Sequence, residues 1–153
     1  MNQIAALLPS ANIALDLDVA SKPRLFEAVG ALFAASSRLD ATTVASSLAA
    51  REKLGSTGLG LGIAIPHGRI KGLKEAVGAF VRLKQPVSFD APDGKPVSQV
   101  FVLLVPEQAT DLHLQILSEL AQMFSERAFR DKLATAATTA DLAALFRQWE
   151  PAA

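Results

Sequence analysis

His67 and His113 are the two histidines of this 153-residue sequence, and imidazole is the side chain whose ordinary pKa lies nearest to neutral pH. The chain contains no cysteine, which excludes disulfides, thiolate metal sites and cysteine nucleophiles. His67 stands between Pro66 and Gly68, behind a glycine-rich segment, where a polar ring packs poorly and stays accessible. We therefore take His67 as the leading candidate for a nucleophilic imidazole.

His113 lies in a segment whose apolar spacing predicts a helix. It shares one face of this helix with Ile116, Leu117 and Leu120, so it is expected to point toward the sheet. It also falls in the first turn, where the positive end of the helix dipole favours a neutral imidazole and attracts an anion such as phosphate. Two interpretations stay open at this point: a residue of the functional site, or an ordinary core histidine.

The glycine-rich segment 55–62 (Gly-Ser-Thr-Gly-Leu-Gly-Leu-Gly) could bind an anion but does not have a nucleotide motif. It lacks the third glycine of the dinucleotide fingerprint, and Leu61 stands where a P-loop requires lysine. Its backbone N–H groups and the hydroxyls of Ser56 and Thr57 could form an anion nest without a metal. Arg51, just before the segment, could clamp a phosphoryl group bidentately. The alternatives are a plain flexible connection and a solvated arginine.

The segments before His67 predict a strand and two helices. Alternating apolar residues predict a strand over 12–18, and a helix with an N-cap at Ser21 should follow. A second helix is expected from a cap at Asp40 to Gly55. The apolar run 62–66 has the length of a strand, which places His67 just past a strand end and makes the glycine-rich segment the least regular part of the chain.

The second half of the chain continues the alternation of strands and helices. Strands are expected over 76–83 and 97–105, the latter central because it is almost entirely apolar. Thr110 or Asp111 should cap the helix that carries His113. Two shorter helices are expected around Phe129 and Leu133 and over 141–149. This order predicts an α/β fold, a mixed parallel and antiparallel sheet flanked by helices on both faces, in a single domain over 1–153.

Both histidines follow the predicted carboxyl end of a strand. Ligand sites in open α/β sheets gather at those ends, so the two imidazoles are expected to meet in one crevice.

Charge and hydropathy limit the classes of partner. Fifteen basic residues balance fifteen acidic ones, which gives no net field toward nucleic acid or anionic lipid. No apolar stretch reaches the roughly 18 residues of a membrane span, and the N-terminus lacks the features of a secretion signal. We expect a cytoplasmic protein that recognises its partners through a local surface, without nucleic-acid binding or membrane insertion.

Two separated motifs carry a family resemblance. Residues 51–58 read Arg-Glu-Lys-Leu-Gly-Ser-Thr-Gly and run on to Gly-Ile-Ala-Ile-Pro-His-Gly-Arg at 62–69, while 111–117 read Asp-Leu-His-Leu-Gln-Ile-Leu. Together they resemble the enzyme IIA domains of the bacterial phosphotransferase system, fructose/mannitol class, and most closely the nitrogen-related regulatory IIA proteins. The resemblance spans nearly the whole chain.

Carried over by position, the resemblance implies that His67 is phosphorylated, that His113 orients or stabilises the phosphorylated ring, and that Arg51 interacts with phosphoryl oxygens. One departure is Leu61, where nitrogen-related members often have asparagine. The implied phosphate-binding loop consists of Ser56, Thr57, Gly58 and Gly68. An apolar rim for partner contact is expected from Leu59, Leu61 and Ile70.

The resemblance implies a phosphoryl donor that is a small HPr-like phosphohistidine protein, and no bound nucleotide, metal or other cofactor. It also implies control of regulatory targets, including kinases and potassium transport components, by phosphorylation state. Three alternatives stay open: a sugar-transport IIA that passes phosphate to a separate IIB protein, a binding module that is never phosphorylated, and a metal-dependent hydrolase. The hydrolase would use His67 and His113 with Asp111 or Glu107 as ligands.

Overall fold

A mixed six-stranded sheet forms the centre of the computed structural model, which describes residues 3–108 and 111–150. Its strands are β1 (Ile13–Leu17), β2 (Gly58–Gly60), β3 (Ile63–Ala64), β4 (His67–Ile70), β5 (Val77–Val87) and β6 (Val97–Pro106). The order is β1-β5-β6-β3-β2, and β4 also pairs with β6. Strand β6 is antiparallel to β5 and parallel to β3 and β4, while β1 is parallel to β5. The predicted central position of β6 is confirmed.

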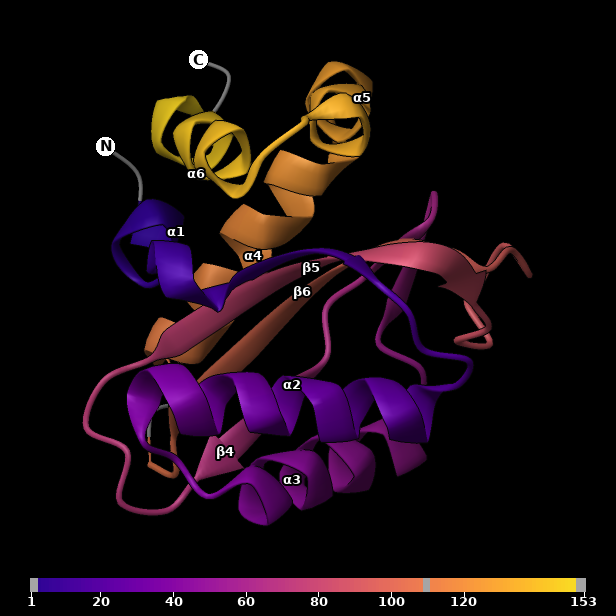
Figure 1. The fold of residues 1–153 in the computed structure, drawn as a ribbon. Helices are drawn as coiled ribbons and strands as arrows, with labels where there is room; N and C mark the ends of the chain where they lie inside the picture. The colour runs from indigo at the N-terminus through magenta and orange to yellow at the C-terminus, as the bar shows by residue number, and fades with distance from the viewer. Residues whose placement is uncertain (1–2, 109–110, 151–153) are drawn as a thin grey trace.

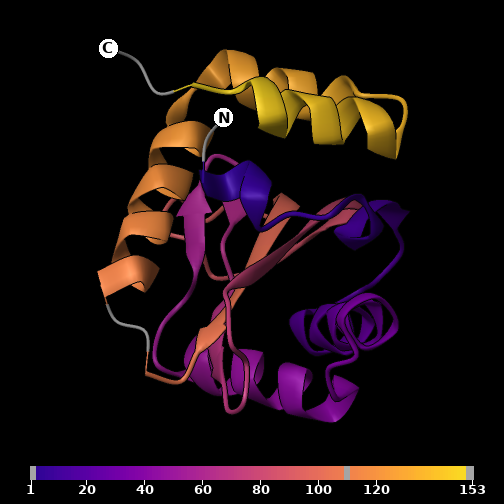
Figure 2. The ribbon, with the colours of Figure 1, turned by 90° about the vertical axis from the view of Figure 1, so that its left-hand side faces the viewer.

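Helices cover both faces of the sheet (Figures 1 and 2). They are α1 (Gln3–Ala6), the 3₁₀ helix η1 (Ser10–Asn12), α2 (Lys22–Ser37), α3 (Ala41–Lys53), α4 (Asp111–Ser125), α5 (Arg127–Thr135) and α6 (Thr139–Gln148). In Figure 1, α2 and α3 lie below the sheet, α1, α5 and α6 lie above it, and α4 runs behind it. The predicted α/β fold is thereby confirmed.

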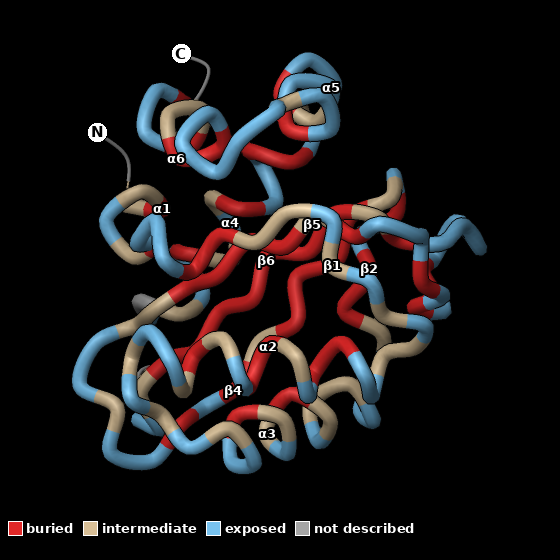
Figure 3. Tube along the Cα trace, in the orientation of Figure 1, coloured by how far each residue is buried: buried red, intermediate tan, exposed pale blue. Residues whose placement is uncertain are grey.

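Two hydrophobic cores form because successive side chains of a strand point to opposite faces. On β6, Phe101 and Leu103 pack against α4, α5 and α6, whereas Val100, Val102 and their neighbours pack against α2 and α3. The buried segments accordingly lie along the sheet and on the inner faces of the helices (Figure 3). A strand with both faces covered must be apolar throughout, which is why β6 has no alternation of polar residues.

The N-caps of α2 and α3 are the residues that the sequence predicts. Ser21 Oγ accepts a hydrogen bond from Arg24 N, and Asp40 Oδ2 accepts one from Thr43 N, so both predicted N-caps are confirmed. Helix α4 begins at Asp111, which is therefore its first helical residue. The alternative cap, Thr110, lies outside the described residues.

The segment before His67 differs from the prediction in two details. The glycine-rich segment contains strand β2, which forms an antiparallel hairpin with β3. His67 is the first residue of β4 and does not follow the end of a continuous strand. Pro66 has no N–H group and interrupts the ladder. Its carbonyl still accepts a hydrogen bond from Leu103 N, so the chain stays beside β6 and resumes as β4.

Among the described residues, none of the helices combines the length and the apolar character that crossing a bilayer requires.

Candidate functional site

His67 is held by hydrogen bonds at both ring nitrogens. Its Nδ1 lies 3.0 Å from the carbonyl oxygen of Ile65, and its Nε2 accepts a hydrogen bond of 3.1 Å from Arg51 Nε. A guanidinium nitrogen can only donate, so Nε2 must be the unprotonated nitrogen. The proton then lies on Nδ1 and is donated to Ile65. This assignment of protons follows from the hydrogen-bond network.

The close packing of β4 on α3 brings His67 to Arg51. Gly68 is buried, and a Cβ atom at this position would overlap Ser47 Oγ on α3. The same Ser47 hydroxyl donates a 3.0 Å hydrogen bond to the carbonyl of Arg69. Gly68 thus allows β4 to pack closely on α3, and its predicted phosphate contact stays a prediction.

Arg51 lies in the last turn of α3 and has two acceptors. Besides the bond from Nε to His67, its Nη1 donates a 2.9 Å hydrogen bond to the carbonyl of Gly55. Within the described part of the chain, Nη2 has no hydrogen-bond partner. The guanidinium is thus oriented from two sides and keeps donors for an incoming anion, which is the geometry expected of a phosphoryl clamp.

His113 lies next to His67, as the sequence predicts. The two ring centroids are 5.2 Å apart and the rings meet edge to face, with 67° between their planes. His113 is in the first turn of α4, and its Nε2 is buried without a hydrogen-bond partner among the described residues. The structure therefore brings the two imidazoles and Arg51 together, and leaves one imidazole nitrogen for a further partner.

Both imidazoles are electrostatically biased toward the neutral state. Burial lowers the pKa of His67 below 6.5, and the charge of Arg51 adds to this effect, while the hydrogen bond to Ile65 and the charge of Glu52 oppose it. Burial also lowers the pKa of His113, with further contributions from His67, Arg69 and Arg51. At neutral pH His67 is therefore uncharged, as a nucleophile must be.

A cavity of about 200 Å³ opens beside His67 and Arg51. Its other lining residues are Ser56, Thr57, Gly58, Leu59, Ile65, Leu117 and Ala121. The predicted loop residues Ser56, Thr57 and Gly58 thus lie around the same space as the histidine.

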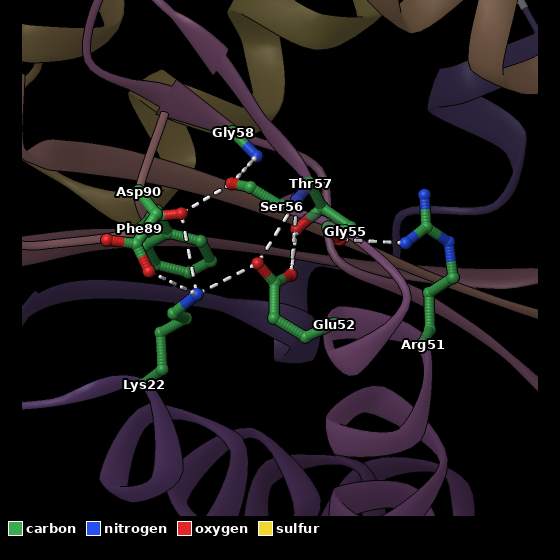
Figure 4. A network of polar contacts seen from close by, with 9 residues as sticks. All are labelled: Lys22, Arg51, Glu52, Gly55, Ser56, Thr57, Gly58, Phe89 and Asp90. Carbon is green, nitrogen blue, oxygen red and sulfur yellow. Dashed lines mark hydrogen bonds and ion pairs between the residues drawn. The ribbon is translucent and has the colours of Figure 1, made fainter. Parts of the chain in front are cut away.

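The donors of this loop are nevertheless bound within the protein (Figure 4). Thr57 N and Oγ1 both donate to the carboxylate of Glu52, at 3.1 Å and 2.6 Å. Ser56 Oγ donates to the carbonyl of Phe89 and accepts from Gly58 N. The donors of Thr57 already bind the protein's own carboxylate, and Gly58 N is bound to Ser56 Oγ, so phosphate binding by this loop stays a prediction. Sequence reasoning missed Glu52, although it follows Arg51 directly in the motif.

The apolar rim differs from the prediction in one residue. Leu59 and Leu61 are exposed as expected, whereas Ile70 is 4% exposed and belongs to the core between the sheet and α2 and α3. Two exposed leucines were not predicted: Leu54, 85% exposed at the end of α3, and Leu114, 65% exposed beside His113. Ile70 is buried because β4 continues past His67 with alternate residues facing inward.

Residues 3–108 and 111–150 contain no group of three histidine, cysteine, aspartate or glutamate side chains placed to hold a metal ion. The ligand set of the hydrolase hypothesis is therefore not assembled among these residues.

A family model matches most of the chain. The model for the phosphoenolpyruvate-dependent sugar phosphotransferase system, EIIA 2, matches residues 6–149. The chain belongs to this family. The resemblance carried by the two histidine motifs is thereby confirmed.

Individual relatives of this IIA chain include regulatory and sugar-specific proteins. It is 49% identical over 119 residues to a nitrogen regulatory protein of Pseudomonas aeruginosa, with 77% of each chain covered. It is 34% identical over 134 residues to the fructose-specific EIIA component of Haloferax volcanii, with 87% of each covered. The crystal structure of nitrogen regulatory protein IIA-Ntr from Neisseria meningitidis superposes with a TM-score of 0.88 at 53% identity, covering 94% of this chain and 99% of that one.

Proposed function

We propose that this chain is a phosphocarrier of the nitrogen-related branch of the phosphotransferase system, which accepts a phosphoryl group on His67 and controls partner proteins by its phosphorylation state. The observation that carries the proposal is the hydrogen bond from Arg51 Nε to His67 Nε2. It places an unprotonated ring nitrogen against a cation that can hold phosphoryl oxygens. Relatives named nitrogen regulatory proteins support the regulatory branch.

The nucleophile is Nε2 of His67. Its lone pair attacks the phosphorus of a donor phosphohistidine, the donor N–P bond breaks, and that electron pair returns to the donor ring. The Nδ1 proton stays in its hydrogen bond to Ile65 throughout. Because bonds of the same kind form and break, the transfer is reversible, and it requires positioning and charge stabilisation more than covalent chemistry from the protein.

Arg51 and His113 stabilise the transferred group. Arg51 exchanges its bond to Nε2 for bonds to phosphoryl oxygens, while its second bond to Gly55 keeps the guanidinium in place. His113 Nε2 is the buried nitrogen without a partner in the described part of the chain, and it orients the phosphorylated ring or its oxygens. The half-buried setting strengthens these interactions because the local dielectric is lower than that of water.

The donor is an HPr-like phosphohistidine protein, and the reaction takes place in the cytoplasm. The exposed Leu54, Leu59, Leu61 and Leu114 form the apolar part of the docking surface. Phosphorylation adds about two negative charges to this surface, so partners that bind one state lose affinity for the other. The regulated targets include a sensor kinase or potassium transport components, and residues 1–153 form one IIA domain.

The decisive experiment is phosphorylation in a purified system of phosphoenolpyruvate, the general phosphotransferase enzyme and the HPr-like carrier. One acid-labile phosphate per chain is expected. His67→Ala should abolish labelling, whereas His113→Ala should slow transfer or shorten the lifetime of the phosphate without unfolding the chain. Full labelling of His67→Ala would refute the assignment.

A second candidate function is a sugar-transport IIA, favoured by the identity to the fructose-specific component of Haloferax volcanii. This function requires rapid transfer from His67 to a separate IIB protein. The labelled chain should therefore be mixed with fructose-type and mannitol-type IIB proteins. Retention of the phosphate favours the regulatory function, and its loss to IIB within seconds favours transport.

A further inference from the structure

We propose that Glu52 is a positioning residue for phosphoryl transfer, which fixes Arg51 by clamping the loop at Gly55 to Gly58. The inference rests on the proposed function of His67 and adds a residue that the two histidine motifs do not by themselves assign. Glu52 does not contact His67. Its positioning effect runs through Thr57, the loop and Arg51, in that order, in addition to the charge effect on the pKa of His67.

The carboxylate of Glu52 is enclosed and fully engaged. Its side chain is only 7% exposed, and it accepts hydrogen bonds from Thr57 N, from Thr57 Oγ1 and from Lys22 Nζ, the last at 3.0 Å. Because an uncompensated buried carboxylate is costly, this arrangement holds the loop to α3 and to the start of α2. A charge-assisted pair of bonds to one residue also fixes its orientation.

The same loop carries the acceptor that orients Arg51. Gly55 lies two residues before Thr57, is exposed, and donates its N–H to the backbone carbonyl of Glu52 at 3.2 Å; apart from its chain neighbours, no atom lies within 4 Å of the position where a Cβ would be. The direction of its carbonyl is therefore set by the anchors on either side, α3 before it and the Glu52–Thr57 contact after it. That carbonyl holds Arg51 Nη1, and Arg51 Nε in turn holds His67.

Arg51 and Glu52 are consecutive residues in the last turn of α3 and diverge by about 100° around the helix axis. Figure 4 shows the result: the two side chains point to different sides of the loop, and one carboxylate and one guanidinium grip it between them. A neutral side chain at position 52 would leave Arg51 present but free to swing with the loop.

The loop is also tied to the connection between β5 and β6. Ser56 Oγ donates to the carbonyl of Phe89, and Lys22 Nζ lies 3.8 Å from Asp90 Oδ2. In Figure 4 these contacts lie on the side of Glu52 away from Arg51. They fix the loop at Ser56 independently of the Glu52–Thr57 contact. Loss of that contact is therefore expected to increase the mobility of the loop more at Gly55, next to Arg51, than at Ser56.

The test compares Thr57→Val, which removes only the hydroxyl bond, with Thr57→Ser, which retains it. Transfer from the phosphorylated carrier is followed at several carrier concentrations. We expect Thr57→Val to lower kcat about tenfold, as for loss of one hydrogen bond to a charged group, with KM changed less than about twofold. Thr57→Ser should restore kcat. Thr43→Val is the matched control, because its hydroxyl also donates to a carboxylate, that of Asp40, at the opposite end of α3 from Arg51.

A double-mutant cycle tests the route through Arg51. In an Arg51→Lys background, Thr57→Val should cause less than about a twofold further loss, because the group that it positions is gone. An independent tenfold loss in that background, or a change confined to KM, would overturn the proposal. The NMR signal of Arg51 Nε–H gives a second measurement that does not depend on turnover, and it should shift toward that of an exposed arginine in Thr57→Val and in Glu52→Gln.

The two proposals fail in different ways. If wild-type protein accepts no phosphate, the function proposed for His67 fails and the role of Glu52 falls with it. If wild-type protein is labelled and Thr57→Val and Glu52→Gln are labelled at the same rate, with an unchanged Arg51 signal, only the positioning role is wrong.

Discussion

Arg51→Lys tests the central geometry of the site while keeping the positive charge. The guanidinium donates from Nε to His67 at 3.1 Å and from Nη1 to Gly55 at 2.9 Å, from two nitrogens that the planar group holds at a fixed separation. A lysine ammonium is a single donor atom on a flexible stem. It can reach the histidine or the Gly55 carbonyl, but it cannot reproduce both bonds in the same fixed arrangement.

The expected magnitude follows from the number of bonds lost. A hydrogen bond to a charged group contributes about 1.5–3 kcal/mol, and about 1.4 kcal/mol corresponds to a tenfold change in rate. Loss of one oriented donor to the phosphoryl oxygens therefore predicts a fall in kcat of about 10- to 150-fold. Long-range attraction of the phosphorylated carrier should persist, since the net charge is unchanged, so KM should change little.

The assay is single-turnover transfer from the phosphorylated carrier, quenched on the millisecond scale and followed as acid-labile label. Arg24→Lys is the control, because Arg24 is an exposed arginine in a surface pair with Glu27. Transfer by Arg51→Lys within about threefold of wild type would refute the argument, because charge alone would then suffice and the bidentate geometry would have no role.

Three further predictions concern pH, strain and packing. Because burial lowers the pKa of His67 below 6.5, the transfer rate should be flat above pH 6.5 and fall only at lower pH. The free energy of unfolding should also decrease below pH 6.5, because the imidazole of the unfolded chain gains a proton before that of the folded chain. This decrease should be smaller in His67→Asn. Leu61 has a φ of 62°, a left-handed backbone conformation that asparagine adopts more easily than leucine. Leu61→Asn should therefore raise the free energy of unfolding by about 1 kcal/mol in urea titrations, whereas Leu59→Asn on the same hairpin should not. Equal gains in the two variants would show that the backbone at Leu61 is not strained. Gly68→Ala should lower the free energy of unfolding by about 1–3 kcal/mol, because the added Cβ overlaps Ser47 Oγ. Adding Ser47→Ala should recover part of this loss in the same urea titrations. If nothing is recovered, the added Cβ clashes with another group.

Local sequence patterns predict most of the fold because most of its rules act over short distances. The caps at Ser21 and Asp40 lie within three residues of the N–H groups that they bind, and the apolar run of β6 reflects burial on both faces. The interrupted strand at Pro66 was missed for the opposite reason. The pairing of β4 with β6 joins residues 36 positions apart, such as His67 and Leu103, and no local pattern in 67–70 announces that pairing.

The residues of the site could likewise be predicted only where local chemistry identifies them. His67, His113 and Arg51 could be selected from side-chain chemistry, since few residue types act as nucleophile or phosphate clamp near neutral pH. The hydrogen-bond partners of Ser56 and Thr57 could not be predicted. A glycine-rich loop has the same sequence whether its donors are free or already bound to a carboxylate. What distinguishes them is that Glu52, at the end of α3, turns back toward the loop. A motif therefore identifies the groups that can react, and the fold decides which of them are free to do so and which hold the others in place.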